Sequence, residues 1–299
     1  MPMPPVPEFL YDAAMVIDQG RRARQEDAIV SDFPAGNGFG FVVLADGMGG
    51  HAAGDIASKI AVTEVFSELK MQSGDPELLE RRIGEVLGDA VLSANECIGL
   101  YSSRSNEHEG MGATLLAPVL MDDRLYWVSV GDSPLYLFRN GTMSRLNANH
   151  ALVSQIDFLV NSGIMARDEA LSHPDQDCLT SVLAGRDIPQ IDCRATPVQL
   201  MHGDIVIAAS DGLQILGEAR IEALLRFAGN QSAERIADGL LQDIGRLDDP
   251  WQDNVSFCVV KVQKQGEAAQ PAKDPVLRRK IKGRNGSVTI LAKVKRSAG

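Results

Sequence analysis

The chain has 299 residues, of which 44% are hydrophobic and 23% are charged, a composition typical of a soluble globular protein. This length fits one large domain or two small ones, and no apolar run approaches the roughly 18 residues that a membrane span needs. The net charge of -11 is unevenly placed: residues 264–299 hold ten Lys/Arg and two Asp/Glu, a balance of +8 that leaves -19 on residues 1–263. An acidic body of this kind argues against nucleic acid as the main ligand.

The N-terminal stretch and the cysteines indicate where the protein works. Residues 1–10 begin with a proline-rich run that lacks the basic and apolar regions of a signal peptide, so we expect a flexible arm. The four cysteines include no C-x-x-C pair, which favours reduced thiols without a chemical role. The default expectation from both features is a cytoplasmic protein.

The first part of the chain predicts strands joined by polar turns. Residues 11–18 carry apolar side chains at alternate positions, and residues 28–30 resume a strand after the charged turn at 20–27. Residues 39–46 form a continuous apolar run, which indicates a buried strand. That strand ends at Asp46, where a glycine-rich turn begins.

Two amphipathic helices are predicted next, at residues 55–69 and 76–101. Asp75 suits the N-cap of the second helix and Pro76 suits its first position. Strands then follow in quick succession, at 113–120, 125–130 and 134–138. Their connections are too short for parallel crossovers, so we expect antiparallel pairing.

The second part of the chain repeats the pattern of an apolar strand that ends in an acidic residue. Residues 147–190 are less regular and read as a flap, with one helix expected at 151–162. The remaining predicted elements are a strand at 204–209, helices at 218–227 and 231–245, and a strand at 255–262. We therefore place one domain at 11–262 and a basic C-terminal tail at 263–299. The tail is open to three interpretations: a solvated tail, a docking segment for an acidic partner, or part of a further module.

Four aspartates stand at the ends of apolar strands, namely Asp46, Asp132, Asp211 and Asp253. For any one of them alone, a solvated turn is a sufficient explanation. If the four met, they would repel one another strongly unless cations lay between them. Oxygen ligands without a Cys/His cluster favour Mg²⁺ or Mn²⁺ over zinc. Periodicity by itself does not establish that the four converge.

Short motifs along residues 11–262 follow one another in a recognisable order. They are Arg22–Asp27, Asp46–His51, Gly112–Thr114, Val130–Ser133, His150 with Gly163, Asp204 with Ser210–Leu213, and Asp253–Asn254. In this order they resemble the metal-dependent Ser/Thr protein phosphatases of the PP2C (PPM) family, in its bacterial form. The resemblance implies an α+β fold, an αββα sandwich of two antiparallel sheets flanked by helix pairs.

The resemblance also implies the metal ligands. Asp46 would bridge two Mn²⁺ or Mg²⁺ ions, and the carbonyl of Gly47 would join it on one of them. Asp211 and Asp253 would hold the second ion, and Asp132 with Asp211 would hold a third, weaker one. The implied reaction is hydrolysis of phosphoserine and phosphothreonine on proteins by a metal-bridging hydroxide.

The remaining implied roles concern water, phosphate and the leaving group. Glu26 and Asp27 would order metal-bound waters, and Arg22 would grip the substrate phosphate, a task for which a bidentate guanidinium is suited. Eukaryotic members of the family have a histidine at the position that Met48 occupies here, so the general acid is open. His51 and a metal-bound water are the two candidates.

The resemblance further implies partners. We expect phosphorylated Ser/Thr proteins as substrates, a cognate Ser/Thr kinase as antagonist, no nucleic acid, no membrane span and a monomer. The alternative is a catalytically impaired scaffold or regulator with the same fold. The presence of all four strand-end aspartates argues against that alternative.

Overall fold

The structure is a computed structural model of the chain. It describes residues 7–49, 53–105, 108, 110–152 and 178–266, and the backbone of strands 276–283 and 286–293. Of the helix expected at 151–162, only residues 151 and 152 are described. His51 also lies outside the described residues.

One antiparallel sheet has the strand order β2-β3-β5-β6-β9. Its strands are β2 (Asp27–Asp32), β3 (Phe39–Met48), β5 (Leu115–Met121), β6 (Arg124–Val130) and β9 (Asp192–Gln199), with the short β4 (Gly112–Ala113) paired to the end of β3. The central strands β3 and β5 are apolar along almost their whole length, because both of their faces are covered. The sequence analysis predicts each of these strands except β9, which is mostly exposed and lies at the edge of the sheet.

The second antiparallel sheet has the order β1-β11-β10-β7-β8. Its strands are β1 (Phe9–Asp18), β11 (Val255–Lys264), β10 (Ile205–Ala209), β7 (Leu135–Arg139) and β8 (Thr142–Arg145). Strand β11 lies between β1 and β10, and it pairs with β1 over ten residues, from Phe9 opposite Lys264 to Asp18 opposite Val255. The sandwich thus joins the beginning of the chain to residues near 260.

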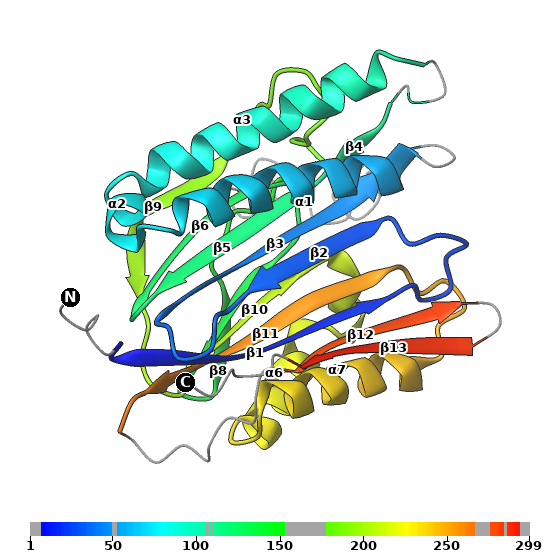
Figure 1. Cartoon of the computed structure of the whole chain (residues 1–299). Coiled ribbons are helices and arrows are strands. Elements are labelled where there is room, and N and C mark those ends of the chain that lie inside the picture. The colour runs from blue at the N-terminus through cyan, green and yellow to red at the C-terminus, as the bar shows by residue number, and fades with distance from the viewer. Residues whose placement is uncertain are drawn as a thin grey trace, which may run out of the picture.

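Helices cover the outer face of each sheet, which gives the four layers of Figure 1. Helices α1 (Ala53–Gln72), α2 (Pro76–Arg81) and α3 (Ile83–Ser102) lie on the first sheet, and α6 (Glu218–Ala228) and α7 (Ala233–Leu247) lie on the second. The αββα sandwich expected from the sequence is therefore confirmed. The helix predicted at 76–101 is in fact two, because the backbone of Arg82 leaves the helical region at φ -113° and ψ 15°.

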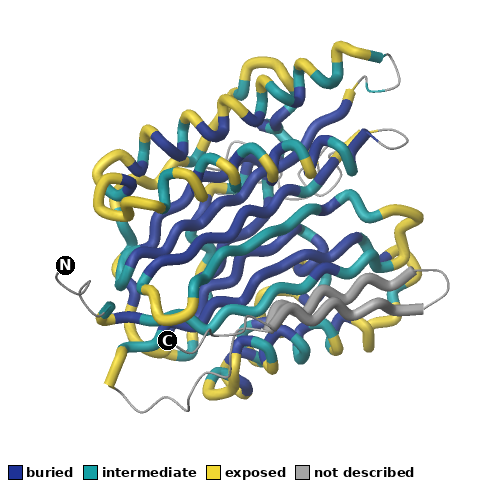
Figure 2. Tube along the Cα trace, viewed as in Figure 1, coloured by how far each residue is buried: buried dark blue, intermediate teal, exposed yellow. Residues whose placement is uncertain are grey.

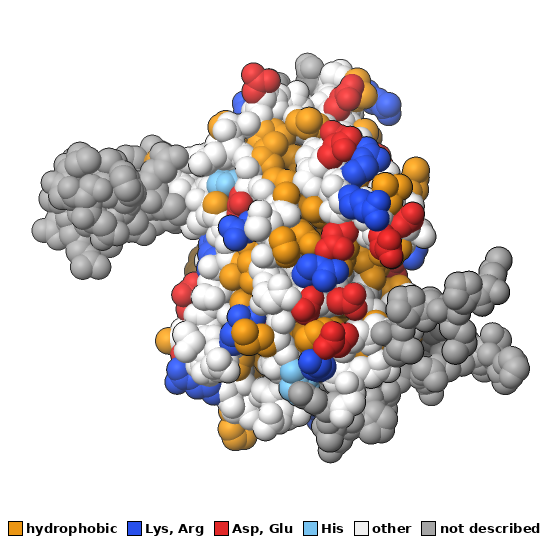
Figure 3. All heavy atoms as spheres, turned by 90° about the vertical axis from the view of Figure 1, so that its left-hand side faces the viewer, with side chains coloured by type: hydrophobic (Ala, Val, Ile, Leu, Met, Phe, Trp, Pro, Cys, Tyr) orange, Lys and Arg blue, Asp and Glu red, His pale blue; other side chains and the backbone are white. Residues whose placement is uncertain are grey.

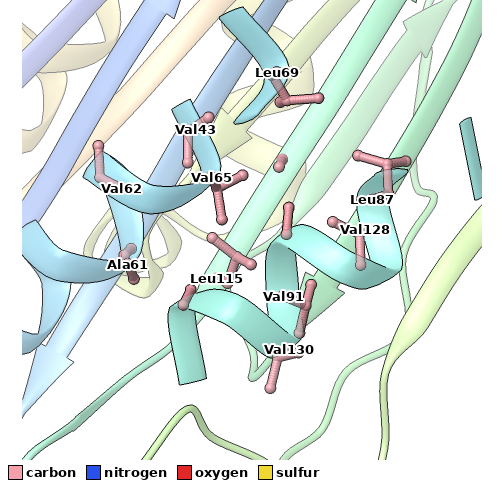
Figure 4. Close-up of a cluster of buried hydrophobic side chains, with 14 of the residues drawn as sticks. Val43, Ala61, Val62, Val65, Leu69, Leu87, Val91, Leu115, Val128 and Val130 are labelled. Atoms are coloured by element: carbon pink, nitrogen blue, oxygen red, sulfur yellow. The ribbon is translucent and has the colours of Figure 1, made fainter. Parts of the chain in front are cut away.

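Three apolar cores hold the layers together. The first lies between α1, α3 and the β2-β3-β5-β6-β9 sheet, where Val65 and Val91 meet Leu115 and Val128 (Figure 4). The second lies under α6 and α7. The third lies between the two sheets and includes Leu116, Trp127 and Val206. Figure 2 shows that burial is continuous along the central strands, whereas exposed residues lie on the outer helix faces, in the loops and on the edge strands β8 and β9.

Four further features of the chain are its C-terminal hairpin, its cysteines, the hydropathy of its helices and its surface charge. Strands β12 (Val276–Gly283) and β13 (Gly286–Lys293) form an antiparallel hairpin within the basic tail, which the sequence analysis did not predict. All four cysteines are free thiols. No helix in the described part of the chain is both long and apolar enough to cross a bilayer. At the end of the sandwich that faces the viewer in Figure 3, acidic and basic side chains are interspersed.

Candidate active site

The register of the first sheet places Asp27 directly opposite Asp46, across β2 and β3. Asp27 is only 3% exposed, and its Oδ2 accepts a hydrogen bond of 2.8 Å from the hydroxyl of Ser210, a residue of the other sheet. Its second oxygen, Oδ1, is buried and has no hydrogen-bond partner among the described residues. Because a buried carboxylate oxygen without a partner is costly, this atom is a candidate ligand for a cation or a water molecule.

The second sheet contributes Asp211 and Asp253. Asp211 follows β10 and begins the short 3₁₀ helix η2 (Asp211–Leu216), and Asp253 lies just before β11. Since β10 and β11 are paired, both residues leave the sheet at the same end. The carboxyl group of Asp211 lies near that of Asp46 and repels its charge, so the two sheets meet at the site. Asp132, which follows β6, is close enough to interact electrostatically with Asp46 and Asp211.

Burial and mutual repulsion raise the pKa values of Asp27, Asp46 and Asp211. Burial is the main cause in each case, and it raises the pKa of Asp27 to about 7 and the pKa of Asp211 to about 6. The pKa of Asp46 lies well above its ordinary value, because burial is reinforced by the charges of Asp27, Asp211, Asp132 and Asp253. Carboxyl groups in contact cannot all ionise unless a cation lies between them, so this donor set fits divalent metal ions with a preference for oxygen.

No three acidic, histidine or cysteine side chains in the described ranges are close enough together to hold a metal ion by themselves. Strand register and one hydrogen bond nevertheless bring four of the aspartates to one end of the sandwich. Asp27 lies opposite Asp46 and is bonded to Ser210, the residue before Asp211. Asp211 and Asp253 leave the second sheet at the same end. Acidic groups that converge without close packing fit Mg²⁺ and Mn²⁺. Such ions are commonly held by one or two carboxylates and keep several water molecules.

The loop that carries Arg22 and Glu26 is fixed by Asn254. The Nδ2 group of Asn254 donates to the carbonyls of Gln19 and Arg24, both at 2.9 Å, and its Oδ1 accepts the backbone N–H of Glu26 at 2.7 Å. The sequence motif contains Asn254, but only the structure shows that it ties the loop to β11. Its position next to Asp253 couples the loop to a candidate metal ligand.

Arg22 and Glu26 lie beside the aspartates, as expected from the sequence. Arg22 donates from Nη2 to Oδ2 of Asp253 at 2.6 Å and remains 57% exposed, so its guanidinium is accessible from solvent. Burial raises the pKa of Glu26, and the charge of Arg22 partly opposes this shift. A carboxylate and an arginine at the rim of an acidic site are suited to position water and phosphate, respectively.

Gly47 occupies a position that only glycine fits. A Cβ at this residue would lie 2.0 Å from the carbonyl oxygen of Gly54 and 2.7 Å from that of Glu26. The backbone N–H of Gly47 donates to the Glu26 carbonyl at 3.1 Å, which holds the end of β3 against the Arg22 loop. This close approach explains a glycine immediately after Asp46.

His150 and Arg145 hold the turn that carries Asp132. The sequence analysis did not predict this supporting role for either residue. His150, which is 2% exposed, accepts the N–H of Gly131 on its ring atom Nδ1 at 3.2 Å, and its backbone N–H donates to the Gly131 carbonyl at 3.0 Å. The Nη2 group of Arg145 donates to the carbonyl of Asp132 at 2.7 Å. Burial lowers the pKa of His150, which agrees with a neutral ring that accepts on Nδ1. His150 belongs to a quoted motif, whereas nothing in the sequence pointed to Arg145.

The structure therefore brings together seven of the predicted site residues from both sheets, namely Arg22, Glu26, Asp27, Asp46, Asp132, Asp211 and Asp253. Gly47 lies next to them at the end of β3, and His51 lies outside the described residues. An αββα sandwich with aspartates from both sheets gathered at their strand ends agrees with the fold and the ligand residues that the sequence resemblance implies for metal-dependent protein phosphatases.

Comparison with known protein families agrees with that class. The family model described as "Protein phosphatase 2C" matches residues 19–244. The chain belongs to the protein phosphatase 2C family.

Curated relatives are named as serine/threonine phosphatases. A "Serine/threonine phosphatase stp" of Listeria innocua is 32% identical over 186 residues, which are 62% of this chain and 71% of the relative. The "Serine/threonine protein phosphatase PstP" of Mycobacterium tuberculosis is 31% identical over 244 residues, which are 81% of this chain and 43% of that longer protein.

Solved structures share the fold. The structure of the Mycobacterium tuberculosis phosphatase PstP/Ppp is 28% identical and superposes with a TM-score of 0.69, over 85% of this chain and 99% of the other. The catalytic domain of PstP in complex with two manganese ions is 27% identical and has a TM-score of 0.68, over 86% of this chain and all of the other.

Proposed function

We propose that the chain is a metal-dependent protein phosphatase that hydrolyses phosphoserine and phosphothreonine on proteins. The observation that carries this proposal is geometric: Asp27 lies directly opposite Asp46 in one sheet, and its carboxylate is bonded to Ser210, the residue before Asp211, from the other sheet. The family membership supports the same function, as does the solved relative with two manganese ions.

The metal ligands are proposed residue by residue. Asp46 and the carbonyl of Gly47 would hold one Mn²⁺ or Mg²⁺ ion, and Asp211 and Asp253 would hold a second. Asp132 with Asp211 would hold a third, weaker ion. When bound, such ions supply a water molecule of lowered pKa and neutralise the charge of the phosphate.

The other residues of the site bind and orient. Arg22 would form a bidentate pair with the substrate phosphate, and its 57% exposure leaves it accessible to a phosphoprotein. Glu26 and Asp27 would fix water molecules by accepting hydrogen bonds, a role that the unpartnered Oδ1 of Asp27 fits. His51 or a water molecule would protonate the leaving Ser or Thr oxygen.

The test is hydrolysis of p-nitrophenyl phosphate and of a phosphothreonine peptide, with Mn²⁺, with Mg²⁺ and with EDTA. We expect turnover of both substrates with a divalent ion and none with EDTA. Asp46→Asn should abolish turnover without unfolding the chain, because it removes a repelled charge. Asp243→Asn is the matched control, since Asp243 of α7 pairs with Arg220 of α6 and with Arg246 of α7, outside the aspartate cluster. Absence of turnover with every ion would favour the impaired scaffold.

We propose the following partners, oligomeric state and location. The substrates would be phosphorylated proteins, and a cognate Ser/Thr kinase would produce them. We also propose that the protein acts as a monomer and in the cytoplasm. The known relatives are phosphatases by name, which supports an active enzyme over the scaffold alternative.

A further inference from the structure

Trp251 is an exposed aromatic residue in a loop whose backbone is held in place. It is 86% exposed, whereas the next residue, Gln252, is 9% exposed. The N–H of Trp251 donates to Oδ1 of Asp249 at 2.8 Å, and the carbonyl of Gln252 accepts the N–H of Arg21 at 2.9 Å. The indole is therefore presented to solvent from a backbone that is fixed on both sides.

This loop belongs to the rim of the candidate active site. Trp251 and Asp253 are two residues apart, so their Cα atoms are separated by no more than about 7 Å. Asp253 accepts the hydrogen bond from Arg22, the proposed phosphate ligand. The two loops pack closely, since a Cβ on Gly20 would lie 2.1 Å from the carbonyl oxygen of Asp253. A phosphorylated residue bound at Arg22 would bring its neighbours in sequence close to the indole.

We propose that Trp251 contacts a large apolar side chain of the substrate, one to three residues from the phosphorylated Ser or Thr, and so determines which phosphosites are preferred. This inference rests on the proposed phosphatase function. An extended peptide advances about 3.3–3.6 Å per residue, so such a side chain reaches the rim while the phosphate is at the arginine. Tryptophan gives a large contact area at low cost in side-chain entropy, and it is enriched among residues that dominate interfaces.

Exposure alone does not distinguish Trp251, because Phe227 is 87% exposed. Phe227 lies on α6 next to Arg226, whose Nε donates to the carbonyl of Gly141. Strand β7 runs from the turn of Asp132 toward Gly141, which places Phe227 near the opposite end of the sheet from the site. Phe227 is therefore a matched control of equal exposure without access to a bound phosphosite.

The experiment uses the full chain and phosphothreonine peptides that carry either Phe or Ser at each position within three residues of the phosphothreonine. For the wild type we expect kcat/KM to favour Phe at one or more positions by about five- to thirty-fold, the range of a single interface residue. Trp251→Ala should remove this preference through KM, Trp251→Phe should retain most of it, and Phe227→Ala should leave it unchanged. Hydrolysis of p-nitrophenyl phosphate should change less than two-fold in all three variants.

Each other result has a defined meaning. A wild type without preference, or an equal loss on Phe and Ser peptides in Trp251→Ala, overturns the role of Trp251 in recognition. A parallel loss on p-nitrophenyl phosphate shows that Trp251 supports the Asp253 loop instead. Sedimentation that shows a wild-type dimer and a Trp251→Ala monomer assigns the indole to self-association. If the wild type hydrolyses none of the substrates with any divalent ion, the proposed function fails first and this inference fails with it.

Discussion

Thr114 holds the backbone of Asp46 from both directions. Its hydroxyl accepts the N–H of Asp46 at 2.9 Å, and its own N–H donates to the Asp46 carbonyl at 2.8 Å. The same hydroxyl lies 2.9 Å from the hydroxyl of Ser133, the residue after Asp132. A single side chain from the segment between β4 and β5 thus connects the strand ends that carry two of the proposed metal ligands.

Replacement of Thr114 by valine should disturb both ligands at once. Thr114→Val leaves the Asp46 N–H without its acceptor, which we expect to cost about 1–3 kcal/mol of unfolding free energy, as for other buried polar groups that lose a partner. It should also weaken Mn²⁺ binding, measured by calorimetry, because Asp46 is less well oriented. Thr114→Ser keeps the hydroxyl and is the control. Equal Mn²⁺ affinity in the Val and Ser variants would show that the hydroxyl does not orient the site.

The stability of the metal-free chain should decrease as the pH rises toward neutrality. Burial raises the pKa of Asp27 from 3.8 to about 7, so the folded chain retains a proton that the unfolded chain has lost. The stabilisation is complete below pH 3.8 and is lost as the pH rises through about 7. For one group the slope is at most about 1.4 kcal/mol per pH unit. Urea unfolding in EDTA at several pH values measures it.

The variant Asp27→Asn isolates this contribution, since asparagine does not titrate. We expect its unfolding free energy in EDTA to depend less on pH than that of the wild type between about pH 4 and 7. The raised pKa of Asp211 acts with the same sign and remains in the variant. Parallel pH profiles for the two proteins would contradict the buried, protonated state of Asp27.

Mn²⁺ should stabilise the folded chain at a pH above these pKa values. An ion that binds only the folded state at 100 times its Kd adds about 2.7 kcal/mol to the unfolding free energy, seen as a rise in Tm. Asp211→Asn should reduce this rise, because Asp211 is a proposed ligand in contact with Asp46. Asp32→Asn should leave the rise in Tm unchanged, because Asp32 lies on β2 and pairs with Lys70. A full Tm rise in Asp211→Asn would remove Asp211 from the ligand set.

The proposed phosphate contact can be tested with two neighbouring arginines. Arg22 and Arg21 are 57% and 56% exposed, and each is paired with an aspartate. Arg22→Lys keeps the charge but loses bidentate geometry, so we expect KM for a phosphothreonine peptide to rise about ten-fold, with a smaller change in kcat. Arg21→Lys should behave as the wild type in the same assay. If both variants raise KM equally, the effect is one of local charge and not of a specific contact.

Sequence patterns predict the strands well where both faces are buried, as in β3 and β5, and the motif order predicts the architecture through the family resemblance. They fail for β9, whose side chains are mostly exposed, and at Arg82, where only the backbone angles reveal a break between helices. The convergence of the aspartates also required the structure. The opposition of Asp27 and Asp46 depends on strand register, and the contact of Asp46 with Asp211 depends on how the sheets stack.

Supporting residues were harder to predict than ligands for a related reason. Thr114 and Asn254 act through backbone groups of residues that are distant in sequence, such as the Asp46 amide and the Gln19 carbonyl. No spacing rule connects such partners. Arg145 contacts the Asp132 carbonyl only because β8 folds back along β7 through a tight turn at Asn140-Gly141.

The pairing of β1 with β11 has a consequence for folding during synthesis. During synthesis, β1 emerges long before β11, which is inserted between β1 and β10. Until then β1 is an unpaired strand, open to association with other chains, and contacts of such long sequence separation form slowly. Asp253 precedes β11 directly, so the last pieces of the site and of the sheet arrive together. A nascent or truncated chain should therefore have no partial activity, and the appearance of turnover would report that folding is complete.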